Sequence, residues 1–203
     1  YDFFPGSPDL SSFPRTLWAR TARDVLREAP DEALHYPDAA GTPELREALA
    51  VYLARVRGVV TPADRVVITT GARQALALLP PALAALEPGG GPPCIAVEHP
   101  SLPEFHLSLA AGGAELVHVP VDEHGLDVGA LAATGARAVI VTPAHQFPMG
   151  VALAPERRAA LLAWAAAAPG RLIVEDDYDS EFRFTSRPLP ALQGLDEHGR
   201  VIY

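Results

Sequence analysis

The protein has 203 residues, of which 49% are hydrophobic and 20% charged, and its formal net charge is −9. These values predict a soluble globular chain with one well-buried core, or one domain plus part of a second. Its acidic residues are spread along the chain, which excludes an electrostatic footprint for nucleic acid on this segment. Its apolar runs are too short to predict a membrane span.

Two residue counts limit the chemistry. A single cysteine, Cys94, cannot form an internal disulfide, which favours a reducing cytoplasm. All 16 basic residues are arginine, so no side chain in the sequence supplies a primary amine. Mechanisms that need a lysine from within these residues are excluded, because a guanidinium group stays protonated and is not a nucleophile.

Two helices are expected before the first strand. The segment 13–29 (FPRTLWARTARDVLREA) carries apolar residues at helical spacing. The second helix is predicted to begin at Pro43, which suits a first turn, with Thr42 as its N-cap. Its apolar residues form one stripe that ends before Gly58.

From Arg65 onward, short β-branched runs alternate with segments rich in alanine and leucine. Strands are expected at 65–70, 94–98, 114–121, 137–142, 171–176 and 200–203, and helices at about 72–86, 102–111 and 155–168. Nearly continuous apolar strands separated by helices predict a three-layer α/β fold, in which helices cover both faces of a mainly parallel sheet. The pair Pro80-Pro81 is expected to kink or split the helix that contains it.

In open α/β sheets, ligands lie beyond the carboxyl ends of the strands. In VVITTGARQAL, Gly71 permits a tight turn into a helix, and the N–H groups of Ala72, Arg73 and Gln74 would point at an anion. This geometry is typical of a phosphate site. The same pattern of strand, glycine and helix is more often a plain turn.

A buried strand in RLIVEDDYDSEFR delivers five carboxylates, which are Glu175, Asp176, Asp177, Asp179 and Glu181. Repulsion among them favours a compensating cation or protonated nitrogen. One alternative is a divalent metal held by Asp177 and Asp179, as in a D-x-D transferase. The other is a carboxylate paired with a protonated pyridine nitrogen, with Tyr178 as a nearby donor. Asp179 and Glu181 also fit the interpretation of solvated loop acids.

The segment VIVTPAHQFPMG places His145 and Gln146 at the tip of a loop stiffened by prolines. Polar side chains on a stiff loop at a strand end suit ligand contact, although a lone histidine is more often structural. The remaining histidines have no metal-ligand spacing, so no metal site is assigned to them.

Together and in order, these segments resemble the fold type I enzymes that depend on pyridoxal 5′-phosphate (PLP), and more narrowly the aminotransferase-like domain of MocR regulators in the GntR superfamily. The phrases that carry the resemblance are FFPGSPDLSSFPRTLWAR, YPDAAGTPELREALAVYLARVRGV, VVITTGARQAL, VTPAHQFPMG, and VEDDYDSEFRF followed by PLPALQGLDEHGRVIY. The resemblance implies an N-terminal arm and first helix over 1–35 and a PLP-binding large domain over 36–203.

The resemblance also implies what the chain lacks. In the family, the stretch similar to RVIY is followed within roughly ten residues by the lysine that forms a Schiff base with the cofactor, and this chain ends first. The fold is therefore expected to be incomplete at its C-terminus, without the small C-terminal domain and without the winged helix of a regulator. No catalytic residue is assigned, and the chain alone is expected to be inactive in transamination and to bind PLP weakly and noncovalently at most.

The resemblance implies contacts for the cofactor within the chain. The phosphate would lie on Gly71, Ala72 and Arg73, the pyridine nitrogen on Asp176, the ring hydroxyl on Tyr178, and His145 or Gln146 would lie beside the ring. Family members place a tyrosine over the ring in the phrase E-D-P-G-Y. This chain has EHPSL there, so Leu102 would cover the ring without aromatic stacking.

Two further residues imply partners. Tyr36 resembles a tyrosine that reaches the phosphate of a neighbouring subunit, which implies a homodimer with shared sites, and Gly6 would lie near the carboxylate of a substrate. The ligand would be an amine or amino acid. The chain would be the effector-sensing part of a transcription regulator, or alternatively a free-standing aminotransferase, and a metal-dependent D-x-D transferase is a remote alternative.

Overall fold

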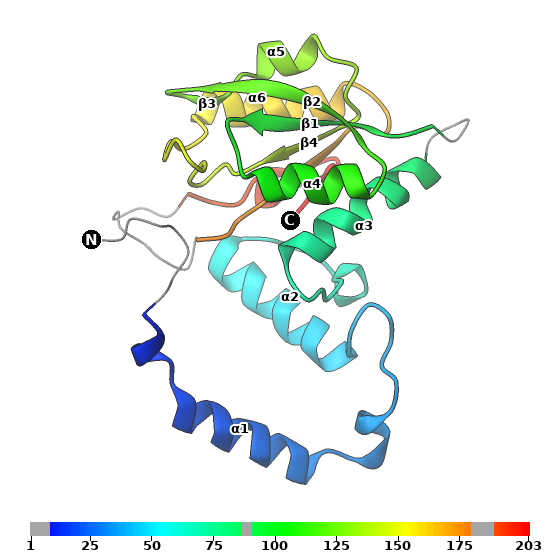
Figure 1. Cartoon of the computed structure of the whole chain (residues 1–203), viewed down its shortest axis with the longest axis vertical. Helices are drawn as coiled ribbons and strands as arrows, with labels where there is room; N and C mark the ends of the chain where they lie inside the picture. The colour runs from blue at the N-terminus through cyan, green and yellow to red at the C-terminus, as the bar shows by residue number, and fades with distance from the viewer. Residues whose placement is uncertain (1–8, 87–90, 180–188) are drawn as a thin grey trace. The chain divides into compact units, whose positions relative to one another are not determined.

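The computed structural model describes residues 9–86, 91–179 and 189–203, and the chain divides into two compact units, Tyr1–Ala39 and Ala40–Tyr203. The first unit contains α1 (Arg15–Glu28) and two short 3-10 helices, Leu10–Ser12 and Asp31–Leu34 (Figure 1). Helix α1 lies within the segment predicted to be helical.

The second unit begins with α2 (Pro43–Arg57), which has the predicted bounds. The helix ends at Gly58, whose φ of 72° lies in the left-handed region that favours glycine. Thr42 occupies the N-cap position, but its side chain makes no capping hydrogen bond. Pro43 at the first helical position starts the helix instead, because its ring fixes φ near the helical value.

In the part of the chain that the structure describes, six strands form one sheet in the order β3-β2-β1-β4-β5-β6. The strands are β1 (Cys94–His99), β2 (Glu115–Asp122), β3 (Gly125–Leu126), β4 (Ala138–Val141), β5 (Leu172–Glu175) and β6 (Val201–Ile202). All neighbouring pairs are parallel except the hairpin of β2 and β3. The prediction of a mainly parallel sheet is confirmed.

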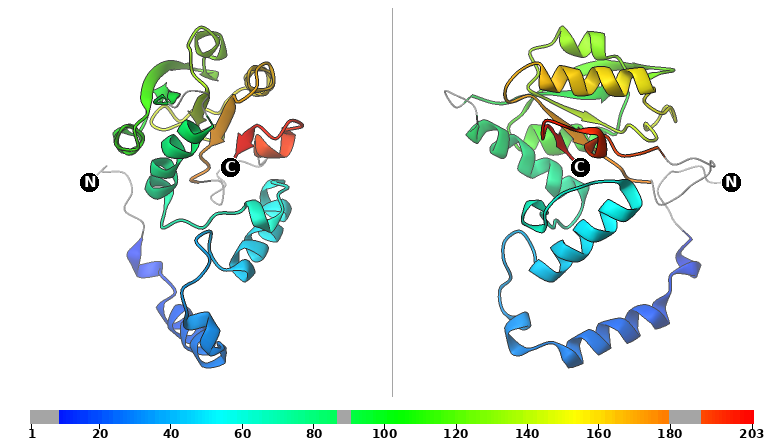
Figure 2. Two further views of the ribbon diagram at one scale, coloured as in Figure 1. Left: turned by 90° about the vertical axis from the view of Figure 1, so that its right-hand side faces the viewer. Right: turned by 180° about the vertical axis from the view of Figure 1, so that it is seen from behind.

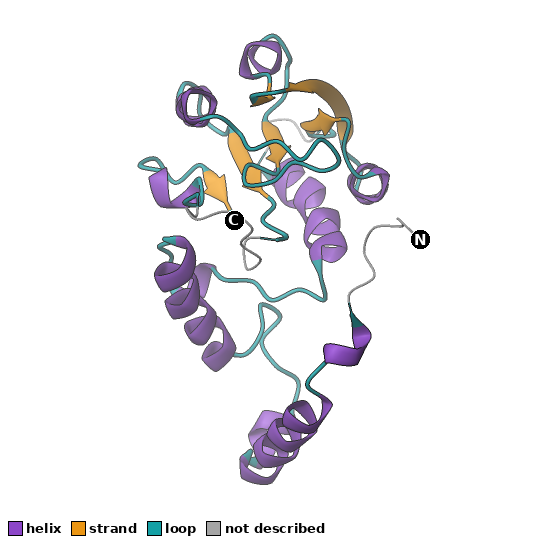
Figure 3. Cartoon of the chain, turned by 90° about the vertical axis from the view of Figure 1, so that its left-hand side faces the viewer, coloured by secondary structure: helices purple, strands orange, loops and turns teal. Residues whose placement is uncertain are grey.

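Helices cover both faces of this sheet (Figures 2 and 3). The helices are α3 (Ala72–Ala85), α4 (Pro103–Ala111), α5 (Val128–Ala132) and α6 (Pro155–Ala166), and 3-10 helices lie at Ala63–Arg65 and Gln193–Leu195. One buried cluster joins the sheet to α5 and α6, for example Val139 with Leu161, and another joins it to α3 and α4, for example Ile140 with Leu109. The expected three layers are therefore present.

The strand expected at 65–70 is not formed. Residues 63–65 make a 3-10 turn, and the segment that follows joins no strand ladder. The Ile68 N–H donates to the Ala40 carbonyl instead, at 2.8 Å. Val66 and Ile68 line a cavity of about 770 Å³ together with Val201 and Ile202, and β6 pairs only with β5 in the described sheet.

The split expected at the proline pair is wrong, because α3 continues through Pro80 and Pro81 as one helix, and the alternative of a kink stays a prediction. Proline adopts the helical φ, and its cost in a helix comes from the lost hydrogen bond and ring crowding. Pro80 is fully buried next to Gly112, where a β-carbon would lie 2.8 Å from the proline ring. The close contact of α4 with α3 at this glycine offsets part of that cost.

Within the described residues, no helix is long and apolar enough to span a membrane.

Candidate functional site

Three neighbouring strands end in polar residues at the same edge of the sheet. Glu98 lies near the end of β1, Thr142 follows β4 and Asp176 follows β5, in the place where ligands bind in open α/β sheets. These residues line a small cavity of about 20 Å³, together with Val97, Ser101, Leu102, Phe105, His106, Ile140, Phe147 and Tyr178. That volume holds about one water molecule.

Asp176 also lines the larger cavity of about 770 Å³, whose wall includes Ala72 at the start of α3. A volume of this size is typical of small-molecule sites. One continuous space therefore reaches from a helix N-terminus to a buried carboxylate. A ligand with an anionic group at one end and a basic nitrogen at the other matches these two ends.

Asp176 has an unusual carboxyl group. Its backbone N–H donates to the Val141 carbonyl at 2.9 Å, which ties the residue to β4. Its Oδ2 is buried and has no hydrogen-bond partner among the described residues. Burial, followed by the charges of Asp177 and Asp179, raises the pKa of Asp176 to about 6. An unpaired buried carboxylate oxygen is costly, and a cationic or N–H donor on a ligand would remove that cost.

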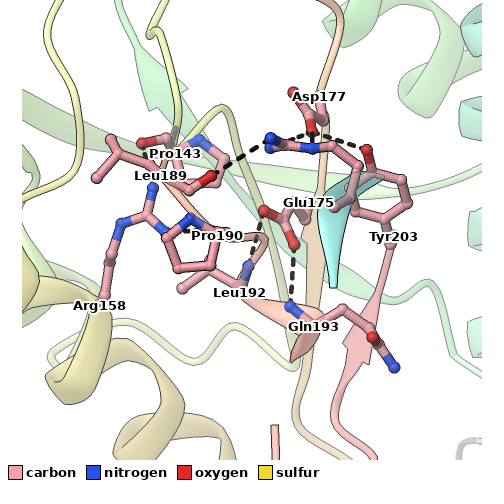
Figure 4. A network of polar contacts seen from close by, with 10 residues as sticks. Pro143, Arg158, Glu175, Asp177, Leu189, Pro190, Leu192, Gln193 and Tyr203 are labelled. Carbon is pink, nitrogen blue, oxygen red and sulfur yellow. Dashed lines mark hydrogen bonds and ion pairs between the residues drawn. The ribbon is translucent and has the colours of Figure 1, made fainter. Parts of the chain in front are cut away.

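The two acids beside Asp176 are held by the protein itself (Figure 4). Asp177 Oδ2 accepts from Arg57 Nε at 2.7 Å and lies 2.6 Å from Arg57 Nη2, and both side chains are almost completely buried. The Tyr203 hydroxyl donates to the same oxygen at 2.7 Å. Glu175 accepts the N–H groups of Leu192 and Gln193 at 2.9 and 3.1 Å.

Asp179 also has a partner within the chain. His145 Nδ1 lies 2.6 Å from Asp179 Oδ2. Within the described residues, no group of three or more acids, histidines or cysteines could hold a metal ion, and Asp177 and Asp179 bind Arg57 and His145 instead. These pairings do not support the D-x-D metal site, and Glu181 lies outside the described residues.

Tyr178 lines the small cavity, and its hydroxyl donates to the His145 carbonyl at 2.8 Å. Burial, followed by the charges of Asp179 and Asp176, raises the pKa of Tyr178 to about 12. The phenol is therefore protonated at neutral pH and acts as a donor. Its partner at present is the backbone of the loop after β4.

Of the two loop residues predicted to contact a ligand, Gln146 is 1% exposed, and its side-chain amide is hydrogen-bonded within the protein. Its amide donates to the Pro100 carbonyl at 2.8 Å and accepts from the Met149 N–H at 3.1 Å. His145 is partly exposed and paired with Asp179. The residue of this loop that lines the small cavity beside Thr142 is Phe147.

The helix start at Gly71 is open. Gly71 has φ of 146°, and no atom lies within 4 Å of the position that a β-carbon would take. Its carbonyl accepts from the N–H groups of Gln74 and Ala75, so Gln74 is not free for an anion, contrary to expectation. The N–H groups of Ala72 and Arg73 precede the first helical hydrogen bond and remain suited to binding an anion.

The side chains of Thr70 and Gln74 hold the turn at Gly71 in place. Gln74 Oε1 accepts from the backbone N–H of Thr70 at 2.6 Å and from the Thr70 hydroxyl at 3.0 Å. These bonds fix the backbone just before the helix. The turn is therefore preformed.

The other predicted residues lie in different places. Leu102 immediately precedes α4 and lines the small cavity with Asp176 and Tyr178. Tyr36 belongs to the first unit and is 95% exposed. Gly6 lies outside the described residues.

Sequence reasoning missed Glu98, Phe147 and Arg57. Glu98 is the only acid in the apolar strand CIAVE, which is a detectable signal of a buried polar group. Phe147 lies in the segment VTPAHQFPMG, in which ligand contact was predicted for the polar residues His145 and Gln146 and not for the phenylalanine. Arg57 lies 120 residues from Asp177 in the sequence, and nothing local distinguishes it from the exposed Arg55 on the same helix.

Comparison with known proteins assigns the chain to a family. The family model for aminotransferase class I and II matches residues 8–202. The chain belongs to this family.

Curated relatives include the probable rhizopine catabolism regulatory protein MocR of Rhizobium meliloti, 37% identical over 99% of this chain and 40% of the relative. They also include the pyridoxine biosynthesis regulator PdxR of Corynebacterium glutamicum, 37% identical over 94% of this chain and 40% of the relative. The chain spans about 40% of the length of these relatives. The resemblance to the aminotransferase-like domains of MocR-type regulators is confirmed.

Solved structures agree on the fold. An archaeal alanine:glyoxylate aminotransferase superposes with a TM-score of 0.80 and 32% identity, over 97% of this chain and 49% of that one. The kynurenine aminotransferase of Pyrococcus horikoshii, in complex with PMP (pyridoxamine 5′-phosphate), gives a TM-score of 0.81 and 27% identity, over 98% and 50%. The fold is that of the large domain of PLP-dependent aminotransferases.

The buried ion pair between Arg57 and Asp177 predicts a large loss of stability in Arg57→Ala, because the substitution leaves Asp177 buried without a cation. We expect the free energy of unfolding to fall by about 3–5 kcal/mol. The matched control is Arg55→Ala on the exposed face of the same helix, expected within about 0.5 kcal/mol of the parent. Urea denaturation of the three proteins measures both values, and equal losses in the two variants would contradict a structural role for the pair.

Proposed function

We propose that this chain is a PLP-binding domain whose two anchors are the start of α3 and Asp176. The observation that carries the proposal is Asp176 Oδ2, a buried carboxylate oxygen without a partner among the described residues. Asp176 lines the same cavity as Ala72, at the open helix start. The group that PLP would present to Asp176 is a protonated ring nitrogen, and the group for the helix start is a phosphate.

The chain's own residues would then have distinct roles. Ala72 and Arg73 donate backbone N–H groups to the phosphate, and Gly71 leaves the approach open. Asp176 holds a proton on the ring nitrogen, and this is favoured because the carboxylate has no competing partner. When bound, the cofactor supplies an electron-withdrawing ring that stabilises negative charge on the amine carbon of a ligand.

Leu102 and Tyr178 would border the ring. Both line the small cavity beside Asp176. Leu102 contributes apolar cover and no aromatic stacking. Tyr178 is a protonated donor at neutral pH, and exchanging the His145 carbonyl for the ring hydroxyl would keep its hydrogen bond satisfied. The small cavity holds about one water, so these side chains must move apart if the ring extends into it.

We further propose that the domain senses an amine or amino acid as part of a transcription regulator that forms a homodimer, with Tyr36 reaching a neighbouring subunit and Gly6 near the ligand. Several relatives at 34–37% identity are named as transcriptional regulators. Aminotransferases are also among the relatives, at 28% identity over 98% of this chain for aromatic-amino-acid aminotransferase 1 from Thermococcus litoralis and 33% over 77% for a valine–pyruvate aminotransferase from Mycobacterium tuberculosis. The regulators at 34–37% identity, which cover 94–100% of this chain, favour a regulator over an enzyme. The sequence contains no lysine, so the chain alone would hold PLP noncovalently.

The cofactor proposal predicts that the purified protein binds PLP and that Asp176→Asn weakens binding. Loss of one charged hydrogen bond is worth about 1.5–3 kcal/mol, or roughly 10- to 100-fold in Kd. Asp64→Asn, at an exposed position of the same unit, is the matched control and should bind as the parent does. Absorption titration measures all three, and equal Kd values for the parent and Asp176→Asn would contradict the assignment.

The regulator proposal predicts a different result for the full-length polypeptide. Loaded with PLP, it should bind a DNA fragment from its own promoter, and one member of a panel of amino acids and amines should change that affinity without sustained turnover. Gel-shift assays and an assay for oxo-acid product measure the two properties. Turnover of an amino acid without any DNA binding would favour the free-standing aminotransferase.

A further inference from the structure

A second carboxyl group faces the small cavity. Glu98 is 4% exposed and lies near the end of β1. One of its oxygens, Oε2, accepts three donors, which are the Thr142 hydroxyl at 2.6 Å, the Thr142 N–H at 3.3 Å and the Gln146 amide at 3.3 Å. Each donor is neutral. Among the residues that the structure describes, Glu98 forms no ion pair.

The groups that face Glu98 explain why its charge is costly. Asp176 and Tyr178 approach from the end of β5, and His106 from α4, around the same cavity. Thr142 and Gln146 come from the loop after β4. Two carboxylates in one buried cavity repel each other, so one of them tends to retain a proton. Burial, with a smaller contribution from Asp176 and in opposition to the three donors, raises the pKa of Glu98 to about 7.

We propose that Glu98 is a proton-holding positioning residue of this site: it holds a proton in the cofactor-free protein at mildly acidic pH and ionises when a cationic ring nitrogen binds at Asp176. The inference rests on the proposed function, because the ring nitrogen supplies the positive charge. The O–H bond of Glu98 breaks, its proton passes to solvent, and both electrons of that bond remain on the carboxylate. The ionised Glu98 then adds to the negative field that keeps the ring nitrogen protonated.

The network around Glu98 distinguishes this electrostatic role from a structural one. Gln146 joins Glu98 to the Pro100 carbonyl and accepts from Met149, so the loops after β1 and β4 are fastened together. Glu98→Gln keeps a carbonyl oxygen for the three donors and replaces the acid O–H by an amide N–H. The variant is therefore a model of permanently neutral Glu98 in which the loop contacts are retained.

The first experiment needs no cofactor. Carboxyl ¹³C NMR of the purified protein, with the Glu98 resonance identified by its loss in Glu98→Gln, should show a titration near the pKa of about 7. Titration at the ordinary glutamate value of about 4.3 would overturn the proposal, because the group would then be ionised before any ligand binds.

The second experiment measures coupling to the ring. PMP (pyridoxamine 5′-phosphate) is the probe because it carries no aldehyde, and its Kd is measured by calorimetry from pH 6 to 8 for the parent, Glu98→Gln, and the exposed control Glu104→Gln. Below the pKa that Glu98 has in the complex, Glu98 is protonated with or without PMP, so the parent and Glu98→Gln should bind equally. As the pH rises past the pKa of Glu98 in the free protein, the ionised group attracts the ring cation, so Glu98→Gln should bind more weakly, by a factor that rises to about tenfold for each unit by which the ring lowers the Glu98 pKa.

The outcomes separate the two proposals. A ratio of Kd values for Glu98→Gln and the parent that stays constant with pH, with normal binding by the parent, would overturn the inference about Glu98 and leave the proposed function standing. Failure of the parent and of Glu104→Gln to bind PMP at any pH would contradict the proposed function and, with it, the ionisation step. A ratio that rises with pH for Glu98→Gln and stays flat for Glu104→Gln supports both.

Discussion

The buried ion pair between Arg57 and Asp177 is the contact on which the site depends. It joins the end of α2 to the residue directly after Asp176, and the Tyr203 hydroxyl completes it from the residue after β6. Three elements far apart in the sequence therefore meet at one carboxylate oxygen. The backbone beside Asp176 is fixed by this meeting, so its side chain can remain buried without a partner of its own.

Consecutive acids after a buried strand repel one another, and the fold assigns each a different partner. Glu175 accepts two backbone N–H groups, Asp177 takes Arg57, and Asp179 takes His145. Among the described residues, Asp176 Oδ2 and Asp177 Oδ1 are both buried without a hydrogen bond, but Asp177 is paired with Arg57 through its other oxygen. A protein built for stability alone would pair or replace a group such as Asp176, and an unpaired one at a strand end is therefore a strong indication of ligand binding.

Much of the fold was predictable from the sequence. The apolar stripe between Pro43 and Gly58 gave α2 its bounds, and continuous apolar runs predicted the parallel strands. The segment 65–70 has the composition of a strand, but a strand also needs a neighbour, and composition does not report one. The proline pair in α3 was misjudged for a similar reason, because the packing of Pro80 against Gly112 is a tertiary contact.

The site was predictable where its signals are local. Gly71 before a helix and the acids after β5 lie in recognisable patterns, whereas Arg57 and Glu98 depend on contacts between distant segments. Gln146 illustrates the same limit, since a polar residue on a stiff loop suits a ligand equally well whether or not it is buried against Pro100. Family resemblance supplied roles for named residues, and the structure showed which of them have partners already.

A crystal structure of the protein with PMP bound tests the two anchors most directly. We expect Asp176 Oδ2 at a charge-assisted hydrogen-bond distance of about 2.7–2.9 Å from the ring nitrogen, with the phosphate on the N–H groups of Ala72 and Arg73. A ligand bound elsewhere, or bound with its ring nitrogen turned away from Asp176, would contradict this expectation.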